Sequence, residues 1–270
     1  MPHELFAVTA ATGALGRLAV AHLRDRVRPD RIVAVAREPG RARDLGVAVR
    51  PGDYDAPDTL VSAFAGVTGL IFVSSPELDP ARRTAQHRAV VAAALRAGVT
   101  DVVYTSFHPV EGLFDAHRAT EEALVAAGLA HTVLRNPFYT EPLVDAAVGV
   151  DVLVHATDGR GLNTAARADL AEAAVAALLR ADTRGRTFTL TGPAWTYPQL
   201  AAALGVPARS GEVAGAMGWL HALACAGVLE VSTGDLRELL DHAPTGIVDQ
   251  LPSTGPKPGG TSGSRGLNAG

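Results

Sequence analysis

Short apolar runs alternate with amphipathic, alanine- and leucine-rich stretches along the first half of this chain. Residues 5–8 (LFAV) have the length and bounds of a buried strand, and a helical pattern covers residues 14–27. The same alternation predicts strands at 31–36, 47–50, 68–73, 101–105 and 131–134, and helices at 41–45, 56–64, 81–97 and 117–127. Strands and helices that alternate at this spacing predict a mostly parallel sheet with right-handed crossovers.

The pattern is less regular after residue 136. Short strands are expected at 150–155 and 187–190, and helices at 167–179, 197–204, 212–228 and 233–240. The stretch Pro252–Gly270 is rich in Gly, Pro, Ser and Thr, so it cannot bury enough apolar surface to order itself. We therefore predict three parts: a doubly wound, Rossmann-type α/β core (1–136), a small C-terminal α/β substrate-binding lobe integrated with it (137–251), and a flexible tail (252–270).

Composition narrows the class of protein. The net charge of −4 gives no general attraction to nucleic acid or to an anionic membrane. Cys225 is the single cysteine, which excludes an internal disulfide and a cysteine-based zinc site, and no histidine spacing predicts a metal. No apolar run reaches the roughly 18 residues of a membrane helix, and the chain enters a core strand at once. We expect a cytoplasmic protein. The single lysine, Lys257, lies in the tail, so the folded body has no lysine for catalysis.

The turn between the first strand and the first helix has the layout of a dinucleotide-phosphate loop, although a small-residue turn without a ligand is the alternative. The start of a helix presents free N–H groups and a positive dipole to a pyrophosphate. Gly13 lets the backbone approach the phosphates, and Gly16 lets the helix pack tightly on the strand. Ala10 replaces the usual first glycine; its methyl group is tolerated if φ stays negative, or it weakens binding. The candidate loop residues are Ala10, Thr12, Gly13, Ala14, Leu15 and Gly16.

Ligands of such sheets lie beyond the carboxyl ends of the strands. Arg37 follows the second strand, where a site for NAD has a carboxylate. Its planar fork of donors suits a 2′-phosphate and so favours NADPH, against the alternative of a solvated surface arginine. The same rule places further candidates around one crevice: Asp53, Tyr54, Ser74, Ser75, Ser106, His108, Asn136, Pro137 and Tyr139.

His117 opens the helix that follows the fifth strand. Because its pKa is ordinarily near neutral, it could donate a proton in its charged form or hold a substrate oxygen. The alternative is a histidine that only caps or packs the helix. Tyr139 competes for the same role, and His108 has a weaker claim. Other histidines, His87 among them, are interpreted as ordinary surface or core residues.

Several segments together resemble one known family. They are VTAATGALG, VAVAREP, PGDYDAPDTL, LIFVSSPE, AGVTDVVYTS, HRATEEALVAAGLAHTVLRNPFYTE, NTAARADLAEA and LHALACAGVLEVSTGDLRELLDHAPT. In this order they resemble the NmrA-like branch of the atypical short-chain dehydrogenases, and most of all its NADPH-dependent quinone reductases. The resemblance covers nearly the whole chain except the tail.

The resemblance implies NADPH on the Gly13/Gly16 loop, Arg37 on the 2′-phosphate, and substrate over the nicotinamide near His117 and the loop Asn136–Tyr139, with Phe138 and His108 as substrate contacts. The Tyr-x-x-x-Lys pair of ordinary short-chain dehydrogenases is absent. The function implied is hydride transfer from NADPH to a quinone-like or polycyclic aromatic carbonyl substrate, without flavin or metal. The alternative is a regulatory protein that senses NADP(H), binds a partner protein and performs no chemistry. A homodimer is also possible.

Overall fold

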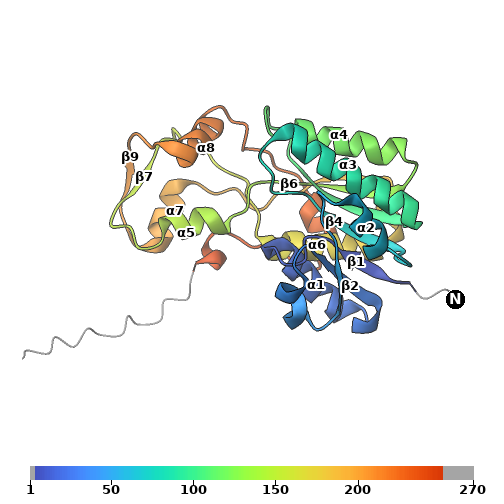
Figure 1. Ribbon diagram of the computed structural model, residues 1–270. Helices are drawn as coiled ribbons and strands as arrows, with labels where there is room; N and C mark the ends of the chain where they lie inside the picture. Colours follow the sequence, from blue (N-terminus) through green and yellow to red (C-terminus); the bar gives the residue numbers. More distant parts are fainter. Residues whose placement is uncertain (1–3, 252–270) are drawn as a thin grey trace, which may run out of the picture.

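Seven parallel strands form the central sheet of the protein (Figure 1). The computed structural model describes residues 4–251, and the predicted tail lies outside that range. The strand order β3-β2-β1-β4-β5-β6-β8 reverses between β1 and β4, which is the switch point where sheets of this type bind ligands. The predicted Rossmann-type fold is confirmed. The strands are β1 (Phe6–Val8), β2 (Ile32–Ala36), β3 (Ala48–Pro51), β4 (Gly69–Val73), β5 (Asp101–Phe107), β6 (Ala130–Asn136) and β8 (Thr187–Thr189).

Helices cover both faces of this sheet, because successive strand residues point to opposite sides. Phe6 and Val8 of β1 belong to one apolar cluster and Ala7 to the other. The first cluster includes α1 (Ala14–Arg26) and α6 (Arg167–Leu179). The second includes α2 (Pro57–Ala63), α3 (Pro80–Ala97) and α4 (Asp115–Ala126). The helix expected at 41–45 is a 3₁₀ helix, η2 (Pro39–Leu45), and further 3₁₀ turns are η1 (Pro29–Arg31), η3 (Ala181–Thr183) and η4 (Val248–Gln250).

A second, smaller unit lies beside the carboxyl ends of the strands (Figure 1). Its two parallel strands are β7 (Leu153–His155) and β9 (Ala208–Ser210), and its own apolar cluster joins Leu143, Trp195 and Leu220. We refer to this unit as the lobe. The sequence pattern did not reveal β9 or α5, and the helix expected at 212–228 is shorter. The lobe helices are α5 (Glu141–Ala147), α7 (Tyr197–Leu204) and α8 (Gly215–Cys225).

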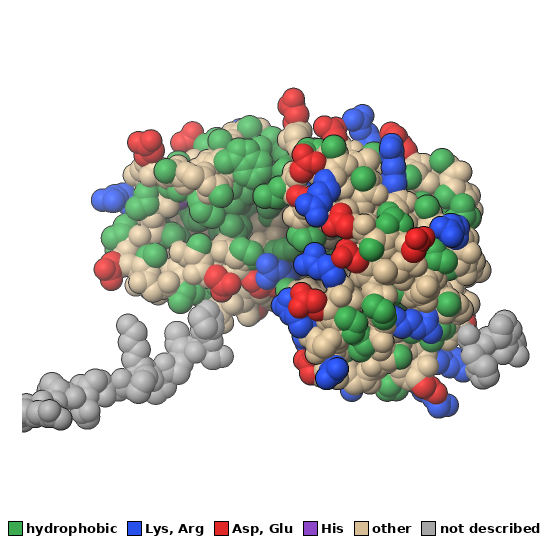
Figure 2. All heavy atoms as spheres, in the orientation of Figure 1, with side chains coloured by type: hydrophobic (Ala, Val, Ile, Leu, Met, Phe, Trp, Pro, Cys, Tyr) green, Lys and Arg blue, Asp and Glu red, His purple; other side chains and the backbone are tan. Residues whose placement is uncertain are grey.

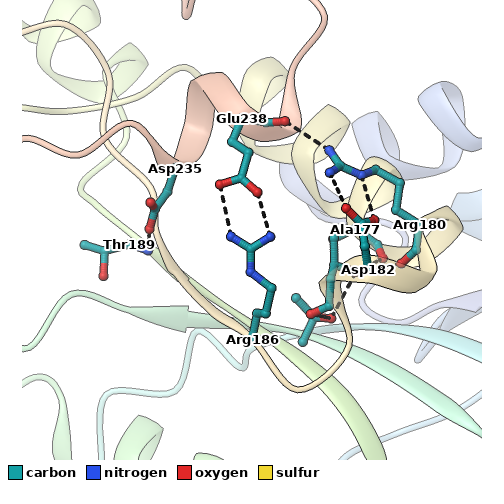
Figure 3. Close-up of polar contacts among 9 residues, drawn as sticks. Ala177, Arg180, Asp182, Arg186, Thr189, Asp235 and Glu238 are labelled. Atoms are coloured by element: carbon teal, nitrogen blue, oxygen red, sulfur yellow. Dashed lines mark hydrogen bonds and ion pairs between the residues drawn. The ribbon is translucent and has the colours of Figure 1, made fainter.

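Part of the chain after residue 137 returns to the core. α6 and β8 pack there, and α9 (Asp235–Leu239) is tied to them by polar contacts (Figure 3). The Arg186 guanidinium donates to both oxygens of Glu238 at 2.6 and 3.0 Å, and Arg180 donates to the Glu238 carbonyl at 3.0 Å. The Thr189 amide donates to Asp235 Oδ2 at 2.7 Å. Residues 137–251 are thus shared between lobe and core. No helix within residues 4–251 is long and apolar enough to span a membrane.

Candidate functional site

The loop between β1 and α1 is tightly folded around Ala10. Its carbonyl accepts the Gly13 amide at 2.9 Å, and the neighbouring Ala11 amide donates to Val35 O at 3.1 Å. Ala10 has φ +47°, so the condition under which its methyl group would be tolerated without strain, a negative φ, is not met. A left-handed conformation at a residue with a Cβ costs about 1–2 kcal/mol. The turn keeps this strained backbone, and such strain is characteristic of functional loops.

Gly16 is essential to that loop. A Cβ added there would lie 2.4 Å from the Ala10 carbonyl oxygen and 2.9 Å from its carbon. Gly13 is less crowded, since its added Cβ would meet the same oxygen at 3.3 Å. Gly16 therefore packs on the turn, not only on the strand. Gly13 and Ala14 are exposed at the start of α1, whereas the Leu15 side chain is buried in the core and can offer a ligand only its backbone.

A pocket of about 520 Å³ opens beside this loop and extends past β2 and β3. It is rich in charged side chains at the end toward Arg37 and Arg41, and Arg82 at its rim pairs with Asp55 at 2.9 Å. Arg37 is exposed and forms no ion pair with any residue of the range 4–251, so its donors are free for a phosphate. The lining residues are Ala10, Thr12, Gly13, Arg37, Glu38, Arg41, Gly52, Asp53, Tyr54, Asp55, Ser75, Pro76, Glu77, Leu78, Arg82 and Gln86.

Hydrogen bonds inside the fold occupy several of the predicted polar candidates. The Tyr54 hydroxyl lies 2.6 Å from Thr9 Oγ1 and 2.7 Å from the Val73 carbonyl, and burial raises its pKa. The Ser75 hydroxyl donates to Gln86 Oε1, and the Ser74 amide donates to Thr105 Oγ1 at 3.0 Å. The Tyr54 and Ser75 hydroxyl groups are therefore engaged inside the fold, whereas Ser74 is engaged through its backbone amide.

Ser106 and His108 differ from their predicted roles as cofactor and substrate ligands. The Ser106 hydroxyl donates to Glu121 Oε1 at 2.6 Å, and Glu121 also pairs with Arg135 at 2.7 Å. His108 Nε2 donates to the Leu190 carbonyl at 2.9 Å, which ties the loop after β5 to the end of β8. Both side chains are buried and engaged within the core. Their roles as ligands stay predictions, and His108 also lines a small cavity with Pro137 and Phe138.

His117 is buried in a hydrogen-bonded cluster of aromatic rings. Its Nδ1 lies 2.8 Å from the Tyr104 hydroxyl, and that hydroxyl lies 3.3 Å from His87 Nδ1. Burial, together with the Arg83 charge and the neighbouring His87, lowers the pKa of His117 to about 3. A histidine with this pKa is neutral at pH 7. The lowered pKa argues against His117 as a charged general acid, and its second predicted role, to hold a substrate oxygen, stays a prediction.

The network determines which nitrogen of His87 carries the proton. His87 Nε2 lies 2.9 Å from the Ser75 amide, which can only donate, so the proton of His87 is on Nδ1. His87 Nδ1 then donates to Thr120 Oγ1 at 2.9 Å. The Tyr104 hydroxyl and His117 Nδ1 share a hydrogen bond of 2.8 Å, and when the hydroxyl is its donor, His117 carries its hydrogen on Nε2. That Nε2 makes no hydrogen bond within the described residues. The sequence predicted no functional role for His87, and its part in this hydrogen-bond network follows only from contacts in the folded structure.

Aromatic side chains extend from His117 toward the lobe. Phe107 lies 6.0 Å from the His117 ring and 5.1 Å from Phe138, which in turn lies 6.0 Å from Trp219 of α8. Trp219 is 45% exposed, so an apolar face is left open. Figure 2 shows hydrophobic side chains gathered on the lobe where it faces the core, and basic side chains across the hollow. We refer to Phe107, Phe138 and Trp219 as the aromatic wall.

The loop after β6 carries the remaining candidates. Asn136 is buried, and its Oδ1 forms no hydrogen bond within residues 4–251. Pro137 lines a cavity of about 10 Å³ with Phe138, room for a single water. The Tyr139 ring packs under the Arg167 guanidinium at 4.7 Å, and burial raises its pKa. The unpaired Asn136 oxygen suits an amide donor such as a carboxamide.

Comparison with known proteins identifies the family. The model of a family described as NAD(P)H-binding matches residues 10–181. The chain belongs to this NAD(P)H-binding family. Quinone oxidoreductase 2 of Escherichia coli is 38% identical over 211 residues, which are 74% of this chain and 73% of that protein. The Citrobacter triphenylmethane reductase complexed with NADP(H) has a TM-score of 0.85 at 30% identity over 92% of this chain and 98% of its own.

The solved structure of the same E. coli relative agrees with this assignment. The structure of the E. coli quinone oxidoreductase complexed with NADPH has a TM-score of 0.81 at 32% identity over 91% of this chain and 98% of its own. The predicted family, an NAD(P)H-dependent oxidoreductase with NADPH as cofactor, is confirmed, and the regulatory alternative is not favoured. The residues present also fit the cofactor, because the Gly13 turn, the exposed start of α1 and the free Arg37 provide anion contacts in one groove.

Proposed function

We propose that the protein reduces quinones and similarly flat aromatic acceptors with NADPH, and that the aromatic wall holds the acceptor. The observation that carries this proposal is the open face of Trp219, joined through Phe138 and Phe107 to His117. Rings stack favourably on such side chains. The reductases to which this chain is similar act, by name, on quinones and triphenylmethane dyes, which are conjugated ring compounds.

The residues of this chain have separate tasks in that reaction. Bound NADPH supplies the hydride, Arg37 holds its 2′-phosphate, and the Gly13 turn holds its pyrophosphate. The Nε2–H group of neutral His117 donates a hydrogen bond to an acceptor oxygen, and Tyr139 is the competing donor. The lobe keeps water away from one face of the acceptor. A homodimer, the cytoplasmic location and the lack of nucleic-acid binding stay predictions.

The test is the loss of NADPH absorbance when benzoquinones, naphthoquinones or aliphatic ketones are added to the purified protein. We expect turnover of quinones and none of aliphatic ketones. Trp219→Ala should raise KM for a naphthoquinone about tenfold, the scale of one lost aromatic contact, with little change in kcat. Trp219→Phe should restore most of the loss. Val248→Ala, which removes another exposed apolar side chain, is the matched control. Tight NADPH binding without turnover of any acceptor would contradict the proposal.

A further inference from the structure

Two neighbouring arginines of α3 have very different surroundings. Arg82 pairs with Asp55 at 2.9 Å and with Glu77 at 3.2 Å. Arg83 forms no ion pair with any residue between 4 and 251, and its Nε is buried there without a hydrogen-bond partner. A buried charged donor without a partner is costly, so an acceptor that reaches it is bound favourably.

Arg83 lies at the His117 end of the crevice. It precedes His87 by about one helical turn on α3 and does not line the pocket beside the phosphate loop. Burial is the main cause that lowers the pKa values of His87 and His117, and the Arg83 charge adds to it; the same charge opposes the rise that burial gives to the pKa values of Tyr104 and Tyr139. Arg83 and His87 are four residues apart on α3 and so share one face of that helix, which places the guanidinium beside the hydrogen-bonded cluster of His87, Tyr104 and His117.

We propose that Arg83 is a catalytic residue that binds the negatively charged oxygen of the reduced substrate. This rests on the function proposed above. When a neutral quinone accepts a hydride, the C–H bond of the cofactor breaks and a new bond to hydrogen forms on the quinone. The quinone is reduced by two electrons and keeps one negative charge on oxygen, and water later protonates it. A nearby guanidinium stabilises this charge as it develops.

A phosphate of the cofactor could supply the same anionic oxygen, so the experiment must separate the two sources. The probe is 2-hydroxy-1,4-naphthoquinone, which carries a negative charge on its oxygens at pH 7, compared with neutral 1,4-naphthoquinone. Calorimetry in the presence of NADP⁺ gives both dissociation constants. The variants are Arg83→Gln, Arg83→Lys and, as matched control, Arg88→Gln, because Arg88 is an exposed arginine of the same helix.

We expect the wild type to bind the anion at least tenfold more tightly than the neutral quinone. Arg83→Gln should abolish that ratio with unchanged affinity for NADPH, Arg83→Lys should restore part of it, and Arg88→Gln should behave as wild type. Turnover of neutral quinones should fall about 100- to 1,000-fold in Arg83→Gln, the scale of one lost oxyanion donor.

Two results would overturn the proposal: an anion preference that survives in Arg83→Gln, or a loss of NADPH and NADH affinity in that variant with the preference unchanged. The second result would assign the guanidinium to a cofactor phosphate. A wild type that reduces no quinone would refute the proposed function, and the two binding constants would still decide whether Arg83 recognises an anion.

Discussion

The two ends of the crevice are built in opposite ways. The end at the phosphate loop is open and charged, and its key contacts come from short segments at the ends of β1 and β2. The end at His117 is buried and aromatic, and its contacts join α3, α4, β5 and the lobe. Backbone and exposed arginines therefore determine how the first end binds, whereas desolvation determines which protonation states the second end can adopt.

Because of this difference, substitutions at the two ends should affect different measurable properties. Changes at the phosphate-loop end should alter cofactor affinity and leave the protonation of the buried histidines unchanged. Changes at the His117 end should alter pH dependence and acceptor binding and leave cofactor affinity unchanged.

The largest effect is expected from Gly16→Ala. The new Cβ would lie 2.4 Å from the Ala10 carbonyl oxygen, so the phosphate loop must move. We expect NADPH affinity to fall more than 100-fold, measured by fluorescence titration, because the loop amides no longer meet the pyrophosphate. Gly234→Ala is the control, since nothing lies within 4 Å of its added Cβ. Normal NADPH binding by Gly16→Ala would show that this turn does not hold the cofactor.

Arg37→Ala should come next. Loss of a charge-assisted contact to the 2′-phosphate should weaken NADPH binding about 10- to 100-fold, which corresponds to roughly 1.5–3 kcal/mol. NADH affinity should change little, since NADH has no such phosphate. Arg43→Ala removes an exposed arginine that does not line the pocket and serves as control. An equal loss for both cofactors would mean that Arg37 does not recognise the 2′-phosphate.

Low pH should reduce the free energy of unfolding through the two buried histidines, His87 and His117. The pKa values of His87 and His117 are about 3 in the folded protein and near 6.5 in the unfolded chain. Between these values the unfolded chain binds more protons, so the free energy of unfolding falls as the pH falls. The slope is up to about 1.4 kcal/mol per pH unit for each histidine. Chemical denaturation from pH 7 to pH 4 measures it.

His117→Gln should flatten that dependence, because Gln keeps a hydrogen-bonding group and does not titrate. In the wild type, kcat should show no histidine titration between pH 5 and 8, since His117 is neutral throughout. A rate that falls with rising pH through the ordinary histidine pKa would restore the general-acid role that was predicted from the sequence.

The smallest effect is expected from Ala10→Gly. Glycine adopts φ +47° without the steric cost of a Cβ, although it also loses more entropy on folding. We expect the melting temperature to stay equal or rise by a few degrees, with NADPH affinity equal or slightly better. Ala92→Gly, at an exposed helical position of α3, should instead cost about 0.5–1 kcal/mol. A clear loss of NADPH affinity in Ala10→Gly would show that the methyl group itself contributes to binding.

The sequence was sufficient for the sheet and for one end of the crevice. A buried strand, a small-residue turn and a helix follow one another within a few residues, so the local pattern alone was enough to place Gly13 and Arg37 beside the pocket. The other end depends on contacts between distant segments. His87 and His117 meet through Tyr104, and burial then removes the charge that their residue type suggests.

Short elements of the lobe were missed for a related reason. β9 is a three-residue strand with exposed side chains, so it has no alternating apolar pattern. Arg83 carried no signal either, because a lone arginine on an amphipathic helix is usually solvated. The folded structure is needed to see that Arg82 pairs with Asp55 whereas the buried Nε of Arg83 has no hydrogen-bond partner among the described residues.

Two polar contacts fasten α9 to β8 and the residue before it, and they limit how the lobe can move (Figure 3). They join Arg186 to Glu238 and Thr189 to Asp235. The chain passes from core to lobe after β6, returns at α6, leaves again after β8 and comes back at α9. A unit on one linker can swing freely, but a unit with several connections must shear against its neighbour. A large movement of the lobe away from the core would therefore require α9 to separate from β8. Amide hydrogen exchange at Thr189 would report how often its hydrogen bond to Asp235 breaks.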